Sequence, residues 1–242
     1  MAAQTQARWL LIGNTRWHWA ANAEQGLACW HSQPPAQGWT AGDSLAAWAA
    51  VGAVPDQAGL DPARRIDLGQ VPLQALPSWL GIDRALVGWR AWQIAQAPVV
   101  VADAGTALSL TRVDGQGHFV GGRLLAGAGL QLQALGQGTA QLPALPSLQA
   151  GLGDSAGPDP VEAWPLATEA ALRSGVGWGL AAAIATAAQQ VWQEEPACQL
   201  FLTGGDGALL DPLVRALLGA QGSGQFTWAP DLAMEALAFL VP

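Results

Sequence analysis

The sequence predicts an α/β protein built from two related units, because one strand–turn–strand pattern occurs in it twice. Residues 8–20 read RWLLIGNTRWHWA, and residues 98–112 read PVVVADAGTALSLTR. In both segments an apolar strand leads into a small polar turn and a further strand-like stretch, so that Gly13 corresponds to Gly105. We expect the two turns to face the phosphates of one nucleotide across a cleft, which indicates phosphoryl transfer.

The first unit opens with strands and continues into helices. Residues 8–31 alternate as strands, with a hairpin turn at residues 24–26. Residues 44–51, rich in alanine and tryptophan, predict a helix capped by Asp43 or Ser44. A second helix is predicted over residues 79–95, where apolar side chains recur at helical spacing.

The second unit is expected to start near residue 97. The apolar, β-branched run after Pro98 is typical of a buried strand, and DGQG at residues 114–117 predicts a hairpin to the next strand. Residues 142–165, dense in Pro, Gly, Ser and Asp, predict an irregular loop. Further elements are predicted in the order helix, helix, strand, helix, over residues 129–135, 169–192, 199–205 and 211–218.

Composition narrows the class of protein. A chain of 242 residues with 51% hydrophobic content is long enough to bury one large core or two small ones. The net charge of −8 and the lack of lysine argue against a nucleic-acid surface. The longest apolar stretch, residues 176–188, is too short to span a bilayer, and no N-terminal segment has the pattern of a signal peptide. We therefore expect a cytoplasmic protein with neither nucleic-acid nor membrane partners.

The cysteines and histidines show no metal-ligand spacing. They fit reduced, isolated core or surface residues better than a metal site. The residues are Cys29, Cys198, His18, His31 and His118.

The residue types of the two turns suit a phosphate site. Glycine lets backbone N–H groups approach an anion closely, and Asn14 and Thr106 add side-chain donors. A Gly-Asn-Thr sequence is also ordinary β-turn chemistry, so one such turn alone would be weak evidence. The repetition of the turn favours the phosphate interpretation.

Seven motifs in a fixed order carry a resemblance to a known family. They are IGNT at 12–15, GIDR at 81–84, DAGT at 103–106, GGRLLAGAGLQLQAL at 121–135, TAQLP at 139–143, TEAALRSG at 168–175 and TGG at 203–205. The chain resembles the type III pantothenate kinases, members of the acetate and sugar kinase, heat-shock protein and actin superfamily. The resemblance implies two ribonuclease H-like, actin-like ATPase domains, residues 1–96 and 97–242, each with a mixed sheet flanked by helices and with the nucleotide cleft between them.

The resemblance also implies an activity. ATP would phosphorylate the primary hydroxyl of pantothenate, giving 4'-phosphopantothenate in the first step of coenzyme A biosynthesis. Asp83 would be the general base, and Gly81, Ile82 and Arg84 would hold pantothenate with it. Thr168 would contact the substrate from the neighbouring subunit of a homodimer. From the residues alone, Asp83 also fits an acid at the positive end of a helix dipole, and Thr168 fits an N-cap.

The nucleotide and its cations are expected at the two turns. ATP, entering with Mg²⁺, would contact the first turn and also Thr106. The residues of that first turn are Ile12, Gly13, Asn14, Thr15 and Arg16. Asp103 would bind a monovalent cation, K⁺ or NH₄⁺, since a carboxylate at the end of a buried strand is costly unless it is paired or coordinated. The alternative is that Asp103 caps the following turn.

The sequence departs from the family pattern at several positions. Leu11 stands where the family has an aspartate that helps to organise Mg²⁺-bound phosphates. Ala126 stands where proline is common, and the upstream aromatic that many relatives use against pantothenate is not evident, with Gln74 near that spacing and Trp79 close by. The loss at Leu11 raises the question of how metal is handled.

A second function of a different class stays open at this point. The same family includes proteins described as accessory factors in transcriptional regulation, and a missing first aspartate is what a degenerate kinase would show. Retention of Asp83, Arg84, Asp103 and Thr106 favours the enzyme. A sugar or acid kinase of the superfamily is disfavoured by the GIDR motif and by the lack of a long inserted substrate domain.

Overall fold

The computed structural model of the protein describes residues 7–24, 26–34, 45–51, 54, 59–148 and 162–241. The chain divides into two compact units. The first comprises Met1–Ile94, Gly117–Phe119 and Asp231–Pro242, and the second comprises Ala95–Gln116 and Val120–Pro230. Packing thus groups the C-terminal residues with the first unit, whereas the division into residues 1–96 and 97–242 stays a prediction about the duplicated lobes.

The first unit contains a four-stranded mixed sheet. Its strands are β1 (Arg8–Ile12), β2 (Trp17–Ala23), β3 (Gly26–Ser32) and β4 (Ala47–Ala50), in the spatial order β3-β2-β1-β4. The β1, β2 and β3 strands are antiparallel neighbours, and β4 lies parallel to β1. The predicted strands and hairpin of residues 8–31 are confirmed.

The helix predicted over residues 44–51 is wrong, because residues 47–50 form β4. Alanine favours a helix locally, but pairing with β1 in the register Trp9↔Ala47 overrides that preference. Trp48 anchors the strand, since its indole N–H donates to the Asp61 carbonyl at 2.7 Å. The proposed caps, Asp43 and Ser44, lie outside the described residues.

Both faces of this sheet are covered. On one face Leu10, Ile12, Trp17, Trp19 and Trp48 form a tryptophan-rich core cluster. Helix α5 (Leu232–Leu240), which the sequence analysis did not predict, packs on β1, β2 and β4.

Helix α1 (Ile82–Ala95) follows two short 3-10 helices, η1 (Pro62–Arg64) and η2 (Leu68–Gln70). It confirms the helix predicted over residues 79–95. Its side chains join it to α5, because Arg90 Nε donates to Glu235 Oε2 at 3.3 Å and lies over the Phe239 ring.

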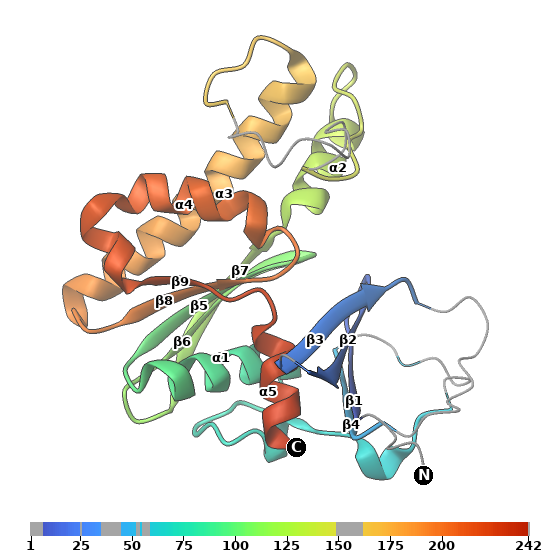
Figure 1. The fold of residues 1–242 in the computed structure, drawn as a ribbon. Coiled ribbons are helices and arrows are strands. Elements are labelled where there is room, and N and C mark those ends of the chain that lie inside the picture. Colours follow the sequence, from blue (N-terminus) through green and yellow to red (C-terminus); the bar gives the residue numbers. More distant parts are fainter. Residues whose placement is uncertain are drawn as a thin grey trace. The chain divides into compact units, whose positions relative to one another are not determined.

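The second unit contains a five-stranded mixed sheet in the order β7-β6-β5-β8-β9 (Figure 1). Its strands are β5 (Val99–Ala104), β6 (Ala107–Val113), β7 (Phe119–Ala126), β8 (Gln199–Thr203) and β9 (Phe226–Trp228). The β5 strand is antiparallel to β6 and parallel to β8. Four of the five β5 valine and alanine side chains are at most 2% exposed, as its continuous apolar run predicts.

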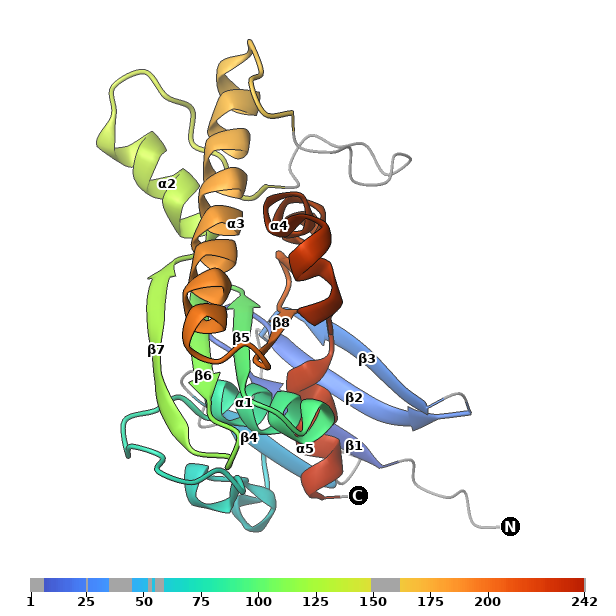
Figure 2. The ribbon, with the colours of Figure 1, turned by 90° about the vertical axis from the view of Figure 1, so that its left-hand side faces the viewer.

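Three helices build the core of the second unit. They are α2 (Ala128–Gly138), α3 (Thr168–Glu194) and α4 (Gly207–Gly222), which ends in the 3-10 turn η3 (Ser223–Gln225). The α3 and α4 helices lie side by side over one face of the sheet, with α2 beside α3 (Figure 2). Leu180, Ile184, Leu210 and Leu213 from these helices meet Leu200 of β8 in one apolar cluster.

The two sheets repeat one topology. The spatial order β3-β2-β1-β4 of the first sheet matches the order β7-β6-β5-β8 in the second. The β1 strand is antiparallel to β2 and parallel to β4, and in the same way β5 is antiparallel to β6 and parallel to β8. Gly13 and Gly105 both follow the first strand of their unit. The predicted α/β class with two related units is confirmed. No helix in the described part of the chain is both long enough and apolar enough to cross a membrane.

Candidate active site

The first predicted phosphate turn connects β1 to β2. Ile12 is the buried last residue of β1, and the Gly13 N–H donates to the Arg16 carbonyl at 3.0 Å, which closes the turn. Asn14, Thr15 and Arg16 are exposed on it. The turn therefore presents polar side chains at the end of a buried strand, as an anion site requires.

Leu11 provides no oxygen ligand at this turn. It is 5% exposed and stands opposite His18 of β2 and Ala49 of β4. Mg²⁺ prefers oxygen ligands, so this position does not fit a magnesium ion held directly by the protein.

The GIDR segment forms the start of α1, with Asp83 and Arg84 in the first helical turn as predicted. Asp83 Oδ1 accepts a hydrogen bond from the backbone N–H of Arg84 at 2.8 Å. The same oxygen lies close to Gly81, since a Cβ added at Gly81 would be 2.5 Å from it. Burial raises the pKa of the Asp83 carboxyl above its ordinary value, against the opposing effects of the Arg84 N–H and the Arg84 charge. A raised pKa makes the carboxylate a stronger base.

One aromatic ring lies beside Arg84, and a second ring packs against the first. The Arg84 guanidinium carbon lies 5.8 Å from the centre of the Phe119 ring, and Trp79 meets that ring edge-on with centroids 6.4 Å apart. The backbone places Phe119 there, because its N–H donates to the Gln74 carbonyl at 2.9 Å. Arg84 is 8% exposed, whereas Trp79 is 71% exposed. The Phe119 contact was missed in the sequence, since no periodic pattern relates the start of β7 to α1.

The second predicted phosphate turn connects β5 to β6. The Gly105 N–H donates to the Ala107 carbonyl at 3.1 Å, and Thr106 is exposed. The Thr106 carbonyl accepts the Gly127 N–H at 3.0 Å, which ties the turn to the N-terminus of α2. An added Cβ at Gly127 would collide with the Gly105 carbonyl oxygen, so α2 begins in close contact with this turn.

Asp103 lies at the carboxyl end of β5 beside the end of β8. It stands opposite Thr203, and an added Cβ at Gly204 would lie 2.5 Å from Asp103 Oδ1. The Gly204 φ of +92° belongs to the left-handed region that favours glycine. The Asp103 carboxylate offers hard oxygen ligands, so this residue type fits a cation at the end of β5. In the described ranges no group of three or more His, Cys, Asp or Glu residues could hold a metal ion.

Thr168 is the first residue of α3 and is exposed. The N-cap is Ala167, so the alternative interpretation of Thr168 as the capping residue is wrong. Ser174, one turn and a half further along, is buried and donates to the Glu162 carbonyl at 2.7 Å. This bond holds the segment before α3 against the helix.

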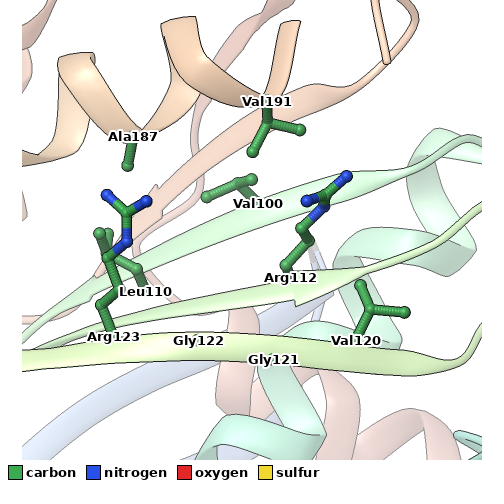
Figure 3. A pocket seen from close by; sticks show the side chains of 9 residues that line it. All are labelled: Val100, Leu110, Arg112, Val120, Gly121, Gly122, Arg123, Ala187 and Val191. Carbon is green, nitrogen blue, oxygen red and sulfur yellow. The ribbon is translucent and has the colours of Figure 1, made fainter. Parts of the chain in front are cut away.

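A cavity of about 180 Å³ lies elsewhere in the second unit, between α3 and strands β5, β6 and β7. Figure 3 shows Arg112 and Arg123 on either side of Val100, both directed towards α3. Arg112 pairs with Glu194 and Glu195 at 3.1 Å, and Arg123 donates to Gln190 at 2.7 Å. None of the predicted site residues lines this cavity.

The predicted site residues are distributed over the two units. The first unit holds Ile12, Gly13, Asn14, Thr15, Arg16, Gly81, Ile82, Asp83 and Arg84, and the second holds Asp103, Thr106 and Thr168.

Comparisons with known proteins identify relatives of the chain. Residues 62–190 match the family model described as type III pantothenate kinase. The type III pantothenate kinase of Thermosynechococcus vestitus is 37% identical over 217 residues, covering 86% of this chain and 81% of that protein. That of Synechococcus sp. strain JA-3-3Ab is 36% identical over 234 residues, covering 96% and 91%.

A solved structure supports the fold. A ROK family glucokinase from Streptomyces griseus, in complex with glucose and AMPPNP, has a TM-score of 0.51 and 16% identity, covering 98% of this chain and 99% of its own. At that identity the likeness concerns the fold alone.

Proposed function

Because this chain belongs to the type III pantothenate kinase family, we propose that it transfers the γ-phosphoryl group of ATP to the primary hydroxyl of pantothenate. The product is 4'-phosphopantothenate, made in the first step of coenzyme A biosynthesis. One structural observation supports this activity most directly: the first turn of α1 holds a shielded carboxyl, Asp83, next to the buried cation Arg84. The curated relatives are kinases, which favours the enzyme over an accessory factor.

Asp83 acts as the general base of the transfer. It accepts the hydroxyl proton while the pantothenate oxygen bonds to the γ-phosphorus and the bond to the β,γ-bridging oxygen breaks, releasing ADP. Its raised pKa suits this role, since the proton finds a more basic acceptor than an exposed carboxylate. The hydrogen bond from the backbone N–H of Arg84 to Asp83 Oδ1 holds the carboxylate in one orientation.

Pantothenate is held by the backbone of Gly81 and Ile82 and by the Arg84 guanidinium, which matches a carboxylate with paired N–H donors. The Phe119 ring, whose centre lies 5.8 Å from the Arg84 guanidinium carbon, packs against this cation. Thr168 contacts the substrate of the partner in a homodimer, and its exposure at the start of α3 is compatible with that role.

The phosphates of ATP are bound by the two turns. Asn14, Thr15 and Arg16 donate from the first turn, which follows Ile12 and is closed by the hydrogen bond from the Gly13 N–H to the Arg16 carbonyl. Thr106 donates from the second turn. Mg²⁺, when bound with the nucleotide, neutralises phosphate charge. A monovalent cation, K⁺ or NH₄⁺, is held by the carboxylate of Asp103. We place the reaction in the cytoplasm, where ATP is available.

The activity is tested by a coupled assay of ADP release from the purified protein. We expect ADP formation that requires pantothenate and Mg²⁺, and that is faster with K⁺ or NH₄⁺ than with Na⁺. Pantothenate-independent ADP release, or no phosphorylated product with any cation, would overturn the proposal and revive the accessory-factor interpretation.

Arg84→Ala is expected to raise the KM for pantothenate by about 10- to 100-fold with a smaller effect on kcat, because a charged hydrogen bond to a carboxylate contributes about 1.5–3 kcal/mol. Steady-state kinetics with pantothenate as the varied substrate measure the change. Arg64→Ala is the matched control, since Arg64 is exposed and its ion pair with Asp61 is 4.0 Å long. An Arg84→Ala enzyme with an unchanged KM would remove Arg84 from the substrate site.

A further inference from the structure

A row of four side chains crosses the first sheet next to the Gly13–Arg16 turn. Leu11 stands opposite His18, His18 stands opposite His31, and Leu11 also stands beside Ala49 on its parallel neighbour. Residues directly opposite each other in a sheet project from the same face. The position of Leu11 is therefore flanked by one imidazole, with a second imidazole one strand further on.

Both imidazoles lie next to the turn. An added Cβ at Gly13 would lie 3.4 Å from His18 Nε2, so the edge of the His18 ring is next to the turn backbone. Arg16 Nη1 lies 3.3 Å from His31 Nε2. Because a guanidinium only donates, this His31 nitrogen accepts and carries no proton in this arrangement.

The titratable and charged groups next to this row are mainly basic side chains. Burial, followed by the charges of His31 and Arg16, lowers the pKa of His18. Helix α5 covers the face that carries Leu11 and His18. Burial, followed by the effects of Asp231 just before this helix and Glu235 within it, raises the pKa of the Cys29 thiol to about 12. Cys29 stands opposite Ala20, and this cross-strand pair is the next one on the same face after the pair His18 and His31. The carboxylates of Asp231 and Glu235 are therefore nearest to the Ala20–Cys29 pair.

We propose that His18 and His31, with Arg16, form part of the phosphate site at the Gly13–Arg16 turn, and that the imidazole pair takes up a proton when a nucleoside triphosphate binds. The inference rests on the proposed function of this turn. In this chain an imidazolium supplies charge next to the phosphates on the side where Leu11 provides no carboxylate to hold a metal ion. His18 and His31 are positioning residues, because they bind phosphate and take no part in the proton transfer from pantothenate.

The sign of the pH effect follows from linkage. A phosphate dianion near an imidazole raises its pKa, so the complex binds more protons than the free protein. Nucleotide affinity then rises as the pH falls through the pKa of the complexed imidazole towards that of the free one. Nucleotide binding is expected to persist when EDTA removes Mg²⁺, since Arg16 and the protonated imidazole neutralise part of the phosphate charge.

The test is calorimetric titration of the full chain with AMPPNP, in buffers of different ionisation enthalpy, with Mg²⁺ or with EDTA. From about pH 8 to about pH 6 we expect the affinity of the unaltered protein to rise about 5- to 10-fold more than that of the His18→Gln, His31→Gln double variant, since one pKa unit corresponds to tenfold in affinity. The double variant retains the titration of the nucleotide itself. Net proton uptake should be lost in it and kept in His118→Gln, which removes an imidazole away from the row.

Leu11→Asp gives a second, independent readout. A carboxylate opposite His18 would keep the imidazole protonated in the free protein, so proton uptake on binding should disappear while the dependence on Mg²⁺ increases. Equal proton uptake in the unaltered protein and the double variant would overturn the inference, and pantothenate phosphorylation could still proceed. Failure to bind AMPPNP at all would overturn both the inference and the proposed function.

Discussion

Asp83→Asn is expected to lower kcat for pantothenate phosphorylation by at least ~100-fold, the size of effect that follows the loss of a general base. Asparagine keeps the shape of the side chain and can still accept the Arg84 N–H through its amide oxygen, but it cannot take the hydroxyl proton at neutral pH. The KM for ATP should stay within about twofold, because Asp83 is proposed to meet only the acceptor hydroxyl.

Steady-state kinetics with each substrate varied in turn measure this result. Asp211→Asn is the matched control, since it removes a carboxylate that pairs with Arg215 on α4. Its kcat should equal that of the unaltered enzyme. A similar kcat for Asp83→Asn would remove Asp83 from the chemistry, and an equal loss in Asp211→Asn would indicate a general structural effect.

The same substitution should stabilise the protein at neutral pH. Because burial raises the pKa of the Asp83 carboxyl, the folded state favours the protonated form. Its contribution to stability is then fully present below the ordinary carboxyl pKa of 3.8 and is lost as the pH rises through the folded-state pKa. Asparagine stays neutral, so the Tm of the variant should exceed that of the unaltered protein at neutral pH. The difference should shrink on acidification, as thermal unfolding followed by circular dichroism can show.

The parts of the fold that could be predicted are those where local pattern and final environment agree. The continuous apolar run of β5 is buried on both faces, and the 3.6-residue spacing of α1 matches its packing. In residues 44–51 the two disagree, because β4 takes its structure from pairing with β1, and alanine alone predicts the wrong state. Helix α5 was missed although its apolar spacing after Asp231 is a readable signal.

The site was predictable only where a short motif carries the signal. Asp83, Arg84 and Asp103 belong to short motifs that carry the resemblance to the family, and their roles were predicted from that resemblance. Phe119 has no such motif, since it reaches Arg84 through a backbone bond to the distant Gln74. The close approach of Gly204 to Asp103 also depends on the pairing of β5 with β8, a long-range contact that sequence periodicity does not contain.

Gly204→Ala is the second substitution expected to have a large effect. Alanine at a φ of +92° is strained by about 1–3 kcal/mol. Its Cβ would also lie 2.5 Å from Asp103 Oδ1 and 2.6 Å from the Ala104 carbonyl oxygen, and the backbone atom of that pair cannot rotate away. The end of β5 must therefore shift, together with the Gly105 turn that follows it. We expect kcat/KM for ATP to fall at least ~100-fold, because a displacement of about 1 Å in a positioning group can have that effect.

The neighbouring glycine supplies the control for this argument. Gly205 has no positive φ, and an added Cβ there would meet no atom within 4 Å, so Gly205→Ala should change stability by less than about 0.5 kcal/mol. Urea unfolding and ATP kinetics over a range of K⁺ concentrations separate the two variants. If Asp103 holds the monovalent cation, Gly204→Ala should need more K⁺ for half-maximal rate, because its clash displaces that carboxylate. Were both variants equally stable and equally active, the carboxyl end of β5 would have no part in nucleotide or cation binding.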